Sequence, residues 1–156
     1  MRMTHRILFV CLGNICRSPT AEAVTRAKAV SRGMQVVLDS AGTGSWHIGK
    51  PPYGPMQDAA RAKGYDLLNL RARQVSRADF QNFDLIVAMD GDNRGDLASV
   101  GPTDRVRLLT DFAPDSGADH VPDPYFTRDF DGALALIEAC AEGLLDALER
   151  KRPQDW

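Results

Sequence analysis

Cysteine is scarce in this sequence. The chain has three, Cys11, Cys16 and Cys140, and no two of them form a Cys-x-x-Cys pair. This excludes a disulfide framework and argues against a structural zinc site or a thioredoxin-like redox motif. The chain also opens without a basic and apolar leader. We therefore expect a reducing, cytoplasmic location, in which a thiol can be kept for its reactivity.

An excess of one charge and long apolar runs are also missing. The 19 Lys and Arg residues nearly balance the 21 Asp and Glu residues, which argues against nucleic acid as a partner. The longest apolar runs, ILFVCL and LIVAM, are far too short to cross a bilayer, so no membrane partner is expected. With 156 residues, 44% of them hydrophobic, the chain can form one domain, residues 1–156, with its own core.

What the chain does have is an alternation of apolar runs and helical patterns. We expect strands at residues 7–10, 34–40, 85–89 and 105–109. We expect helices from Pro19, capped by Ser18, to about residue 31, at 56–63, and from the cap Asp90 to about residue 98. The last helix carries an apolar stripe of Ala133, Ile137, Cys140, Leu144 and Leu148. This order predicts an α/β fold with a parallel sheet.

The loop between the first strand and its helix, CLGNICRS at residues 11–18, has the makings of an anion site. Backbone N–H groups and the positive end of the helix dipole can converge there on a tetrahedral oxyanion. Gly13 permits backbone angles that other residues resist, and Asn14 tolerates the left-handed region better than most residues. Arg17 can bind two oxygens of the anion. The rest of this phosphate-binding loop is Leu12, Ile15, Cys16 and Ser18.

Cys11 stands where these dipoles and Arg17 point, so its thiolate form is favoured, and Ser18 can donate a hydrogen bond to the sulfur. A cysteine alone at a strand end would be interpreted as a small buried residue; the offsets of the loop residues favour a nucleophile that attacks phosphorus. The nucleotide-binding motifs GxxxxGK[ST] and GxGxxG are both absent.

With Cys11 and Arg17 as the ends of a C-x5-R motif, C-L-G-N-I-C-R-S closely resembles the low-molecular-weight protein tyrosine phosphatases. D-S-A-G-T at 39–43, R-A-R-Q at 71–74, M-D-x-x-N at 89–93 and V-P-D-P-Y at 121–125 are also similar to that family. The resemblance implies three layers: a four-stranded parallel sheet with helices on both faces, and the phosphate-binding loop after strand 1. It implies no metal and no cofactor.

The resemblance also implies a two-step mechanism. Cys11 attacks phosphorus while Asp123 protonates the departing phenolic oxygen, and water activated by Asp123 then hydrolyses the cysteinyl-phosphate. Arg17 and the loop N–H groups stabilise the transition state. Asp-Pro pairs are common in turns, so Asp123 alone would indicate nothing; its two flanking prolines and the family match favour catalysis.

The expected substrate is a tyrosine-phosphorylated protein, with inorganic phosphate or similar oxyanions as inhibitors. Trp46, Tyr125 and Phe126 can wall in a phenyl ring, although Trp46 can equally pack its own loop. Related protein-arginine phosphatases carry Thr where this chain has Ile15, and an apolar side chain suits an aromatic ring better. The same aromatic pair, Tyr125 and Phe126, leaves either a monomer or a weak homodimer as the expected state.

The resemblance implies that Cys16 forms a reversible disulfide with Cys11; the alternative is a buried structural thiol. Three positions depart from the family pattern. Leu70 stands where a histidine often supports the loop, which leaves Asn14 to Ser40 or water. Tyr53 and Pro55 replace the Asp and Arg of many relatives, which changes a second loop near the site.

Two other functions compete with the phosphatase. An arsenate reductase needs additional cysteines in a mobile segment, and residues 69–100 contain none. A non-catalytic phosphoprotein-binding module would use the anion loop alone, and it needs neither a nucleophile nor an acid. The three histidines, His5, His47 and His120, form no ligand set in sequence, and His120 is expected at the surface.

Overall fold

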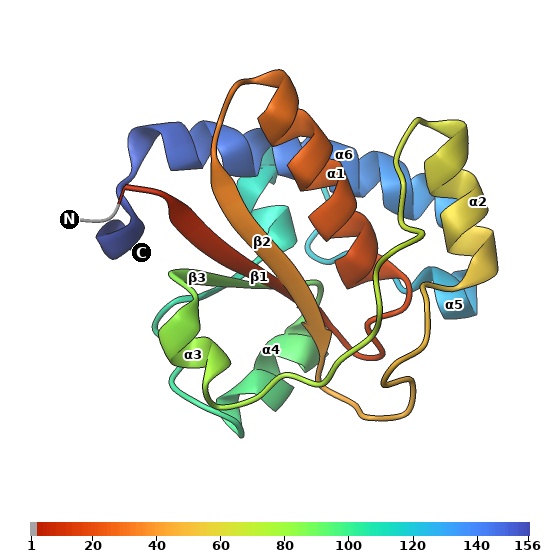
Figure 1. Cartoon of the computed structure of the whole chain (residues 1–156), viewed down its shortest axis with the longest axis horizontal. Helices are drawn as coiled ribbons and strands as arrows, with labels where there is room; N and C mark the ends of the chain where they lie inside the picture. The colour runs from red at the N-terminus through yellow and green to blue at the C-terminus, as the bar shows by residue number, and fades with distance from the viewer. Residues whose placement is uncertain (1–2) are drawn as a thin grey trace.

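The computed structural model describes residues 3–156 and confirms the predicted α/β fold. Four parallel strands form one sheet in the order β2-β1-β3-β4. They are β1 (His5–Cys11), β2 (Val36–Gly42), β3 (Leu85–Ala88) and β4 (Val106–Leu108). Figure 1 shows the sheet between two layers of helices.

Helices α1 (Arg17–Ser31), α2 (Gly54–Ala62) and α6 (Phe130–Arg150) lie on one face of the sheet. The short helix α3 (Asp79–Asn82) and α4 (Gly91–Ala98) lie on the other. A single-turn helix, α5 (Pro124–Thr127), stands near the start of α1. Short 3-10 turns also occur, two before α5 and one after α6, at Leu109–Phe112, Pro114–Ser116 and Pro153–Asp155. None of the helices in residues 3–156 has both the length and the apolar character needed to cross a bilayer.

The central strand β1 explains the unbroken apolar run in the sequence. Ile7 and Phe9 enter the core formed with α1 and α6, whereas Leu8 and Val10 enter the core beneath α3 and α4. All four side chains are fully buried, because both faces of the sheet are covered. The predicted stripe of α6 is buried as well, including Cys140.

Two local predictions were wrong. The second strand begins at Val36 and ends at Gly42, because its pairing with β1 runs from His5↔Val36 to Cys11↔Gly42. Ser18 does not cap α1: the helix begins at Arg17, with Cys16 at the N-cap position and Pro19 as its third residue. Within the phosphate-binding loop only Asn14 adopts a positive φ, of 56°; Gly13 does not.

The site is positioned by sheet topology. The chain passes from β1 to β2 on one side, and β3 pairs with the other side of β1, so the strand order reverses at β1. Ligands of open α/β sheets bind beyond the carboxyl ends of the strands at such a point. Cys11 ends β1 there, directly before the loop that leads into α1.

Candidate active site

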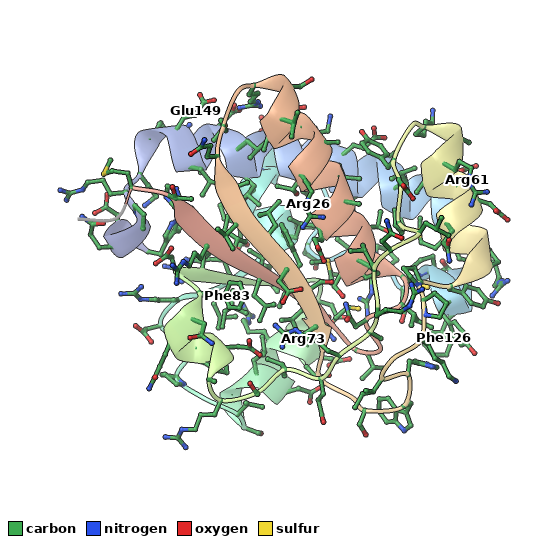
Figure 2. All side chains as sticks on the ribbon, in the orientation of Figure 1. Arg26, Arg61, Arg73, Phe83, Phe126 and Glu149 are labelled. Atoms are coloured by element: carbon green, nitrogen blue, oxygen red, sulfur yellow. The ribbon has the colours of Figure 1, made fainter. Side chains whose placement is uncertain are left out.

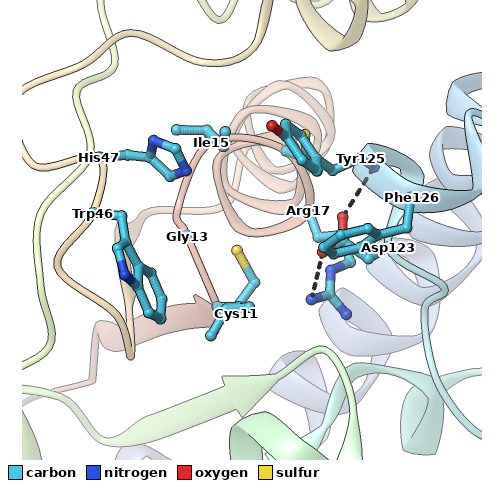
Figure 3. A pocket seen from close by; sticks show the side chains of 11 residues that line it. Cys11, Gly13, Ile15, Arg17, Trp46, His47, Asp123, Tyr125 and Phe126 are labelled. Atoms are coloured by element: carbon cyan, nitrogen blue, oxygen red, sulfur yellow. Dashed lines mark hydrogen bonds and ion pairs between the residues drawn. The ribbon is translucent and has the colours of Figure 1, made fainter.

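A cavity of about 230 Å³ opens at the carboxyl end of β1. Figure 3 shows the Cys11 sulfur between two walls, with Trp46 and His47 on one side and Asp123, Tyr125 and Phe126 on the other. The cavity brings together most of the predicted site residues: Cys11, Leu12, Gly13, Ile15, Cys16, Arg17, Trp46, Asp123, Tyr125 and Phe126. Asn14, Ser18 and Ser40 are the predicted residues outside this lining, and all three are buried.

The Cys11 sulfur has two polar neighbours. The Ser18 hydroxyl lies 3.0 Å from Sγ, and the backbone N–H of Asn14 donates to Sγ at 3.2 Å. Ser18 lies in the first turn of α1, so the positive end of the helix dipole also faces this region. Each of these features stabilises negative charge on the sulfur.

The side chain of Asn14 stabilises the conformation of the phosphate-binding loop through three hydrogen bonds. Its Nδ2 donates to the hydroxyls of Ser18, at 2.8 Å, and Ser40, at 3.0 Å. Its Oδ1 accepts the backbone N–H of Arg73 at 3.0 Å. The predicted support from Ser40 is therefore present. These three bonds hold a non-glycine residue in the left-handed region, which is otherwise disfavoured.

Sequence reasoning missed the groups that hold this network in turn. Glu22, buried in α1, accepts the Ser40 hydroxyl at 2.8 Å. Arg73 lies beside the end of β2 (Figure 2) and forms ion pairs with Asp39 and Asp79, each at 3.0 Å. Nothing local in the sequence marks these residues as partners, because they meet only when β2, α1 and the segment before α3 pack together.

The guanidinium of Arg17 is bound mainly through Nη1. Its Nη1 lies 2.6 Å from Asp90 Oδ2 and donates to the Val121 carbonyl at 3.0 Å. Its Nη2 lies 3.4 Å from Asp123 Oδ2, and its buried Nε has no hydrogen-bond partner in residues 3–156. Burial opposes the charge, but Cys11, Asp90 and Asp123 raise the pKa of Arg17, so the guanidinium stays cationic.

Asp90 was predicted only as a helix cap. It does cap α4, since its Oδ1 accepts the Asn93 N–H at 2.7 Å. The second role of Asp90, the contact with Arg17, joins residues 73 positions apart. The M-D-x-x-N resemblance at 89–93 was the signal that could have identified this role.

Asp123 begins α5. Its Oδ1 accepts the Tyr125 N–H at 3.1 Å, while Oδ2 faces Arg17. Both interactions are drawn in Figure 3. The side chain of Asp123 is 21% exposed, so one carboxylate edge can reach a ligand in the cavity.

The outer walls are apolar. Trp46 and Phe126 are 67% and 72% exposed, and Ile15 also lines the cavity, between His47 and Tyr125 (Figure 3). Sequence reasoning missed His47 as a wall residue. Its ring stands over Gly13, where an added Cβ would come within 3.0 Å of His47 Cδ2. A side chain at position 13 would therefore displace the imidazole. His120, in contrast, is at the surface, paired with Asp119 as well as exposed.

The three cysteines are free thiols. Burial, together with the charges of Asp123 and Cys11, raises the pKa of Cys16 to about 12. Burial alone raises the pKa of Cys140 to about 11. Both therefore remain protonated at neutral pH.

Comparison with known proteins agrees with this geometry. The sequence profile of the family described as low molecular weight phosphotyrosine protein phosphatase matches residues 6–154. The low molecular weight protein-tyrosine-phosphatase YfkJ of Bacillus subtilis is 43% identical over 151 residues, covering 94% of this chain and 97% of YfkJ. The crystal structure of YfkJ superposes with a TM-score of 0.91, covering 94% of this chain and 96% of that one.

Two further solved structures are similar. A protein tyrosine phosphatase from Entamoeba histolytica, with Hepes in its active site, is 36% identical with a TM-score of 0.90, over 94% of this chain and 98% of that one. The Drosophila arginine phosphatase is 35% identical with a TM-score of 0.84, over 90% of this chain and 96% of that one. On fold, site and sequence together, the chain belongs to the low molecular weight phosphotyrosine protein phosphatase family.

Proposed function

We propose that this protein hydrolyses phosphotyrosine through a covalent phosphate ester of Cys11, with Asp123 as general acid and base. Membership of the family makes the protein a protein tyrosine phosphatase, and phosphoproteins are its substrates. The observation that carries the proposed chemistry is one cavity that contains a thiol, a guanidinium with an unpartnered Nε and a partly exposed carboxyl group.

In the first step, Sγ of Cys11 forms a bond to phosphorus as the bond from phosphorus to the phenolic oxygen breaks. The proton of the Asp123 carboxyl passes to that oxygen, and the dephosphorylated tyrosine side chain leaves with the rest of its protein. Nε and Nη2 of Arg17 donate to the equatorial oxygens, since Nη1 is already engaged by Asp90 and Val121. The N–H groups of the phosphate-binding loop supply the remaining donors.

In the second step, water attacks phosphorus and the sulfur departs as thiolate. The Asp123 carboxylate takes a proton from that water, so the general acid is restored and inorganic phosphate is released. Ser18 and the Asn14 N–H stabilise the departing thiolate, as they do the attacking one. No cofactor enters either step.

The cavity walls favour an aromatic leaving group. Trp46, Tyr125 and Phe126 provide flat apolar surfaces on both sides of the sulfur, and the lining residue Ile15 is apolar as well. A guanidinium-linked phosphate would leave its N–H donors facing these apolar side chains. We therefore favour phosphotyrosine over phosphoarginine.

Five further expectations belong to this proposal. Residues 1–156 form a single domain, inorganic phosphate and similar oxyanions bind the same loop as competitive inhibitors, and the protein acts in the cytoplasm. It is a monomer or a weak homodimer through the exposed Tyr125 and Phe126. Cys16 protects the nucleophile as a disulfide partner. The lack of any cysteine in residues 69–100 argues against an arsenate reductase, which needs further thiols to relay a disulfide.

The test is phosphate release from phosphotyrosine in EDTA by the wild type, Cys11→Ser and Asp123→Asn. We expect turnover by the wild type, none by Cys11→Ser, and retention of phosphate binding by that variant. Asp123→Asn should lose about 10²–10⁴-fold in kcat. Binding without turnover by the wild type would instead support the phosphoprotein-binding module.

A further inference from the structure

Tyr53, directly before helix α2, contacts both the phosphate-binding loop and the segment that carries Asp123. Its backbone N–H donates to the Ile15 carbonyl at 2.8 Å. Its hydroxyl accepts from Nη1 of Arg128 at 3.1 Å, and its ring lies 5.2 Å from that of Tyr125. Tyr53 therefore spans from the loop of the nucleophile to α5.

Arg128 completes this connection from the other end of α5. Its guanidinium carbon lies 5.3 Å from the centre of the Tyr53 ring and 5.0 Å from that of Phe130, in positions typical of cation–π contacts. Its Nη1 also donates to the Tyr125 carbonyl at 3.3 Å. We refer to Tyr53, Arg128 and Phe130 as the clasp.

The backbone of Arg128 is in a conformation that arginine disfavours. It has a φ of 63° at the C-cap of α5, and it is one of two non-glycine residues in 3–156 with a positive φ. The other is Asn14, which lies in the phosphate-binding loop. Unfavourable backbone angles persist where surrounding contacts hold them, and they concentrate at functional sites. Glycine would fit position 128 without strain, so the side chain of Arg128 has a use that offsets the strain.

The segment that the clasp holds is short. Helix α5 is a single turn, Pro124–Thr127, and a helix of that length does not hold its position by itself. Asp123 is its N-cap and Arg128 its C-cap, so contacts at Arg128 fix the orientation of the whole turn. The carboxyl group of Asp123 must be placed within hydrogen-bond reach of the leaving oxygen to act as an acid.

We propose that the clasp positions the general acid: Tyr53 and Arg128 are positioning residues that fix α5, and with it Asp123 and Tyr125, over the Cys11 loop. This rests on the proposed role of Asp123. In this chain an aromatic ring and a cation connect the two loops.

The proposal predicts a dependence on the leaving group. A phenol of high pKa needs a proton as it departs, whereas the more acidic p-nitrophenol departs readily without one. Weakening the clasp should therefore lower kcat/KM, which reports the step in which the phenol departs, more for phenyl phosphate than for p-nitrophenyl phosphate. A residue that merely stabilises the fold would lower both rates equally. Tyr53→Ala should also raise KM for both aryl substrates, because the Tyr125 wall loses its support.

The experiment measures kcat and KM for both substrates, and thermal unfolding, for five variants. Arg128→Gly removes the contacts of the guanidinium and relieves the strain of the positive φ. Tyr53→Ala removes the contacts of the Tyr53 ring with Tyr125 and Arg128 but keeps the backbone hydrogen bond to Ile15. Tyr53→Phe keeps the ring and removes the hydroxyl. Arg61→Ala, an exposed arginine of α2, is the matched charge control. Asp123→Asn serves as the reference for complete loss of the acid.

Support would be a drop of about 10-fold in kcat/KM for phenyl phosphate in Arg128→Gly and Tyr53→Ala, a fraction of the about 10²–10⁴-fold that a general acid provides. The kcat/KM for p-nitrophenyl phosphate should fall less than threefold, Arg128→Gly should unfold no earlier than the wild type, and Arg61→Ala should match the wild type. Suppose that Asp123→Asn discriminates between the two substrates but that Arg128→Gly and Tyr53→Ala change both substrates equally, or change neither. The proposal would then be overturned. If Asp123→Asn itself does not discriminate, the proposed role of Asp123 fails first, and the clasp proposal with it.

Discussion

Asp90 contacts Arg17 at 2.6 Å with one carboxylate oxygen and caps helix α4 with the other. The same side chain thus links the guanidinium in the cavity to a helix on the far face of the sheet. Because Nη1 of Arg17 is engaged there and at Val121, only Nη2 and Nε can face an anion above Cys11. Asp90 therefore sets which edge of the guanidinium is available to a phosphate.

These two roles of Asp90 can be separated by substitution. Asn caps helices nearly as well as Asp but lacks the charge that holds Arg17, whereas Ala does neither. We expect Asp90→Asn to lose about 10–100-fold in kcat/KM through misorientation of Arg17, with little change in stability. Asp90→Ala should lose the same activity and about 1 kcal/mol of unfolding free energy. Activity assays and urea unfolding of both variants measure this. Wild-type activity in Asp90→Asn would show that Arg17 is oriented without Asp90.

Substitutions at Asn14 can distinguish the effect of its side-chain hydrogen bonds from the effect of its backbone conformation. Asn14→Ala and Asn14→Gly both remove the side-chain bonds to Ser18, Ser40 and Arg73, so both should lose most activity. Glycine tolerates the φ of 56°, whereas alanine is strained by about 1 kcal/mol. We expect Asn14→Gly to be the more stable of the two by about that amount in urea unfolding. Equal stability would mean that the loop relaxes once the bonds are lost.

The sequence predicts well what local pattern determines. The run at 7–10 is a strand covered on both faces, Asp90 caps α4, and the loop from Cys11 to Ser18 surrounds the cavity. Each of these depends on neighbours in the chain: an apolar run, a capping residue, a strand that leads into a helix. The residues of that loop are close in space because they are adjacent in the sequence.

Long-range contacts decide the rest. The start of β2 is set by its register with β1, and the hydropathy of Met34 gave no indication of it. Ser18 is a good capping residue, but the thiol of Cys11 and the amide of Asn14 engage its hydroxyl. Glu22 and His47 acquire their roles from residues distant in sequence. The turn α5 is too short for a periodic pattern to mark it.

Protection of the nucleophile by Cys16 is a third prediction. Burial, then Asp123 and Cys11, raise the pKa of Cys16 to about 12, so it stays a thiol at neutral pH and peroxide should oxidise Cys11 first. The sulfenic acid of Cys11 can then condense with the Cys16 thiol, which forms the disulfide and releases water. Dithiothreitol should restore most activity of the peroxide-treated wild type, and several-fold less of Cys16→Ala.

The control for this experiment is Cys140→Ala, because Cys140 is also buried and protonated but lies in α6, outside the cavity lining. It should recover as the wild type does. Equal recovery by Cys16→Ala and the wild type would show that Cys16 is only a buried structural thiol.

Alkaline stability gives a prediction with a definite sign. Burial raises the pKa of Cys140 from 9.0 to about 11, so between these values the folded protein holds a proton that the unfolded chain has lost. The stabilisation from Cys140 is therefore complete below pH 9 and is lost as the pH rises toward 11. Two pKa units correspond to about 2–3 kcal/mol at most.

Wild type and Cys140→Ala share the raised pKa of Cys16, so its contribution cancels when the two are compared. Near pH 8 the variant should be the less stable by about 1 kcal/mol, because alanine leaves a small cavity in the core between α6 and the sheet. From pH 9 to 11 the wild type should lose stability faster, so that the difference shrinks or reverses. Urea unfolding at half-unit pH steps measures both curves. Parallel curves would show that the Cys140 thiol ionises as readily in the folded protein as in the unfolded chain, which its complete burial against Ile137 and Leu144 makes unfavourable.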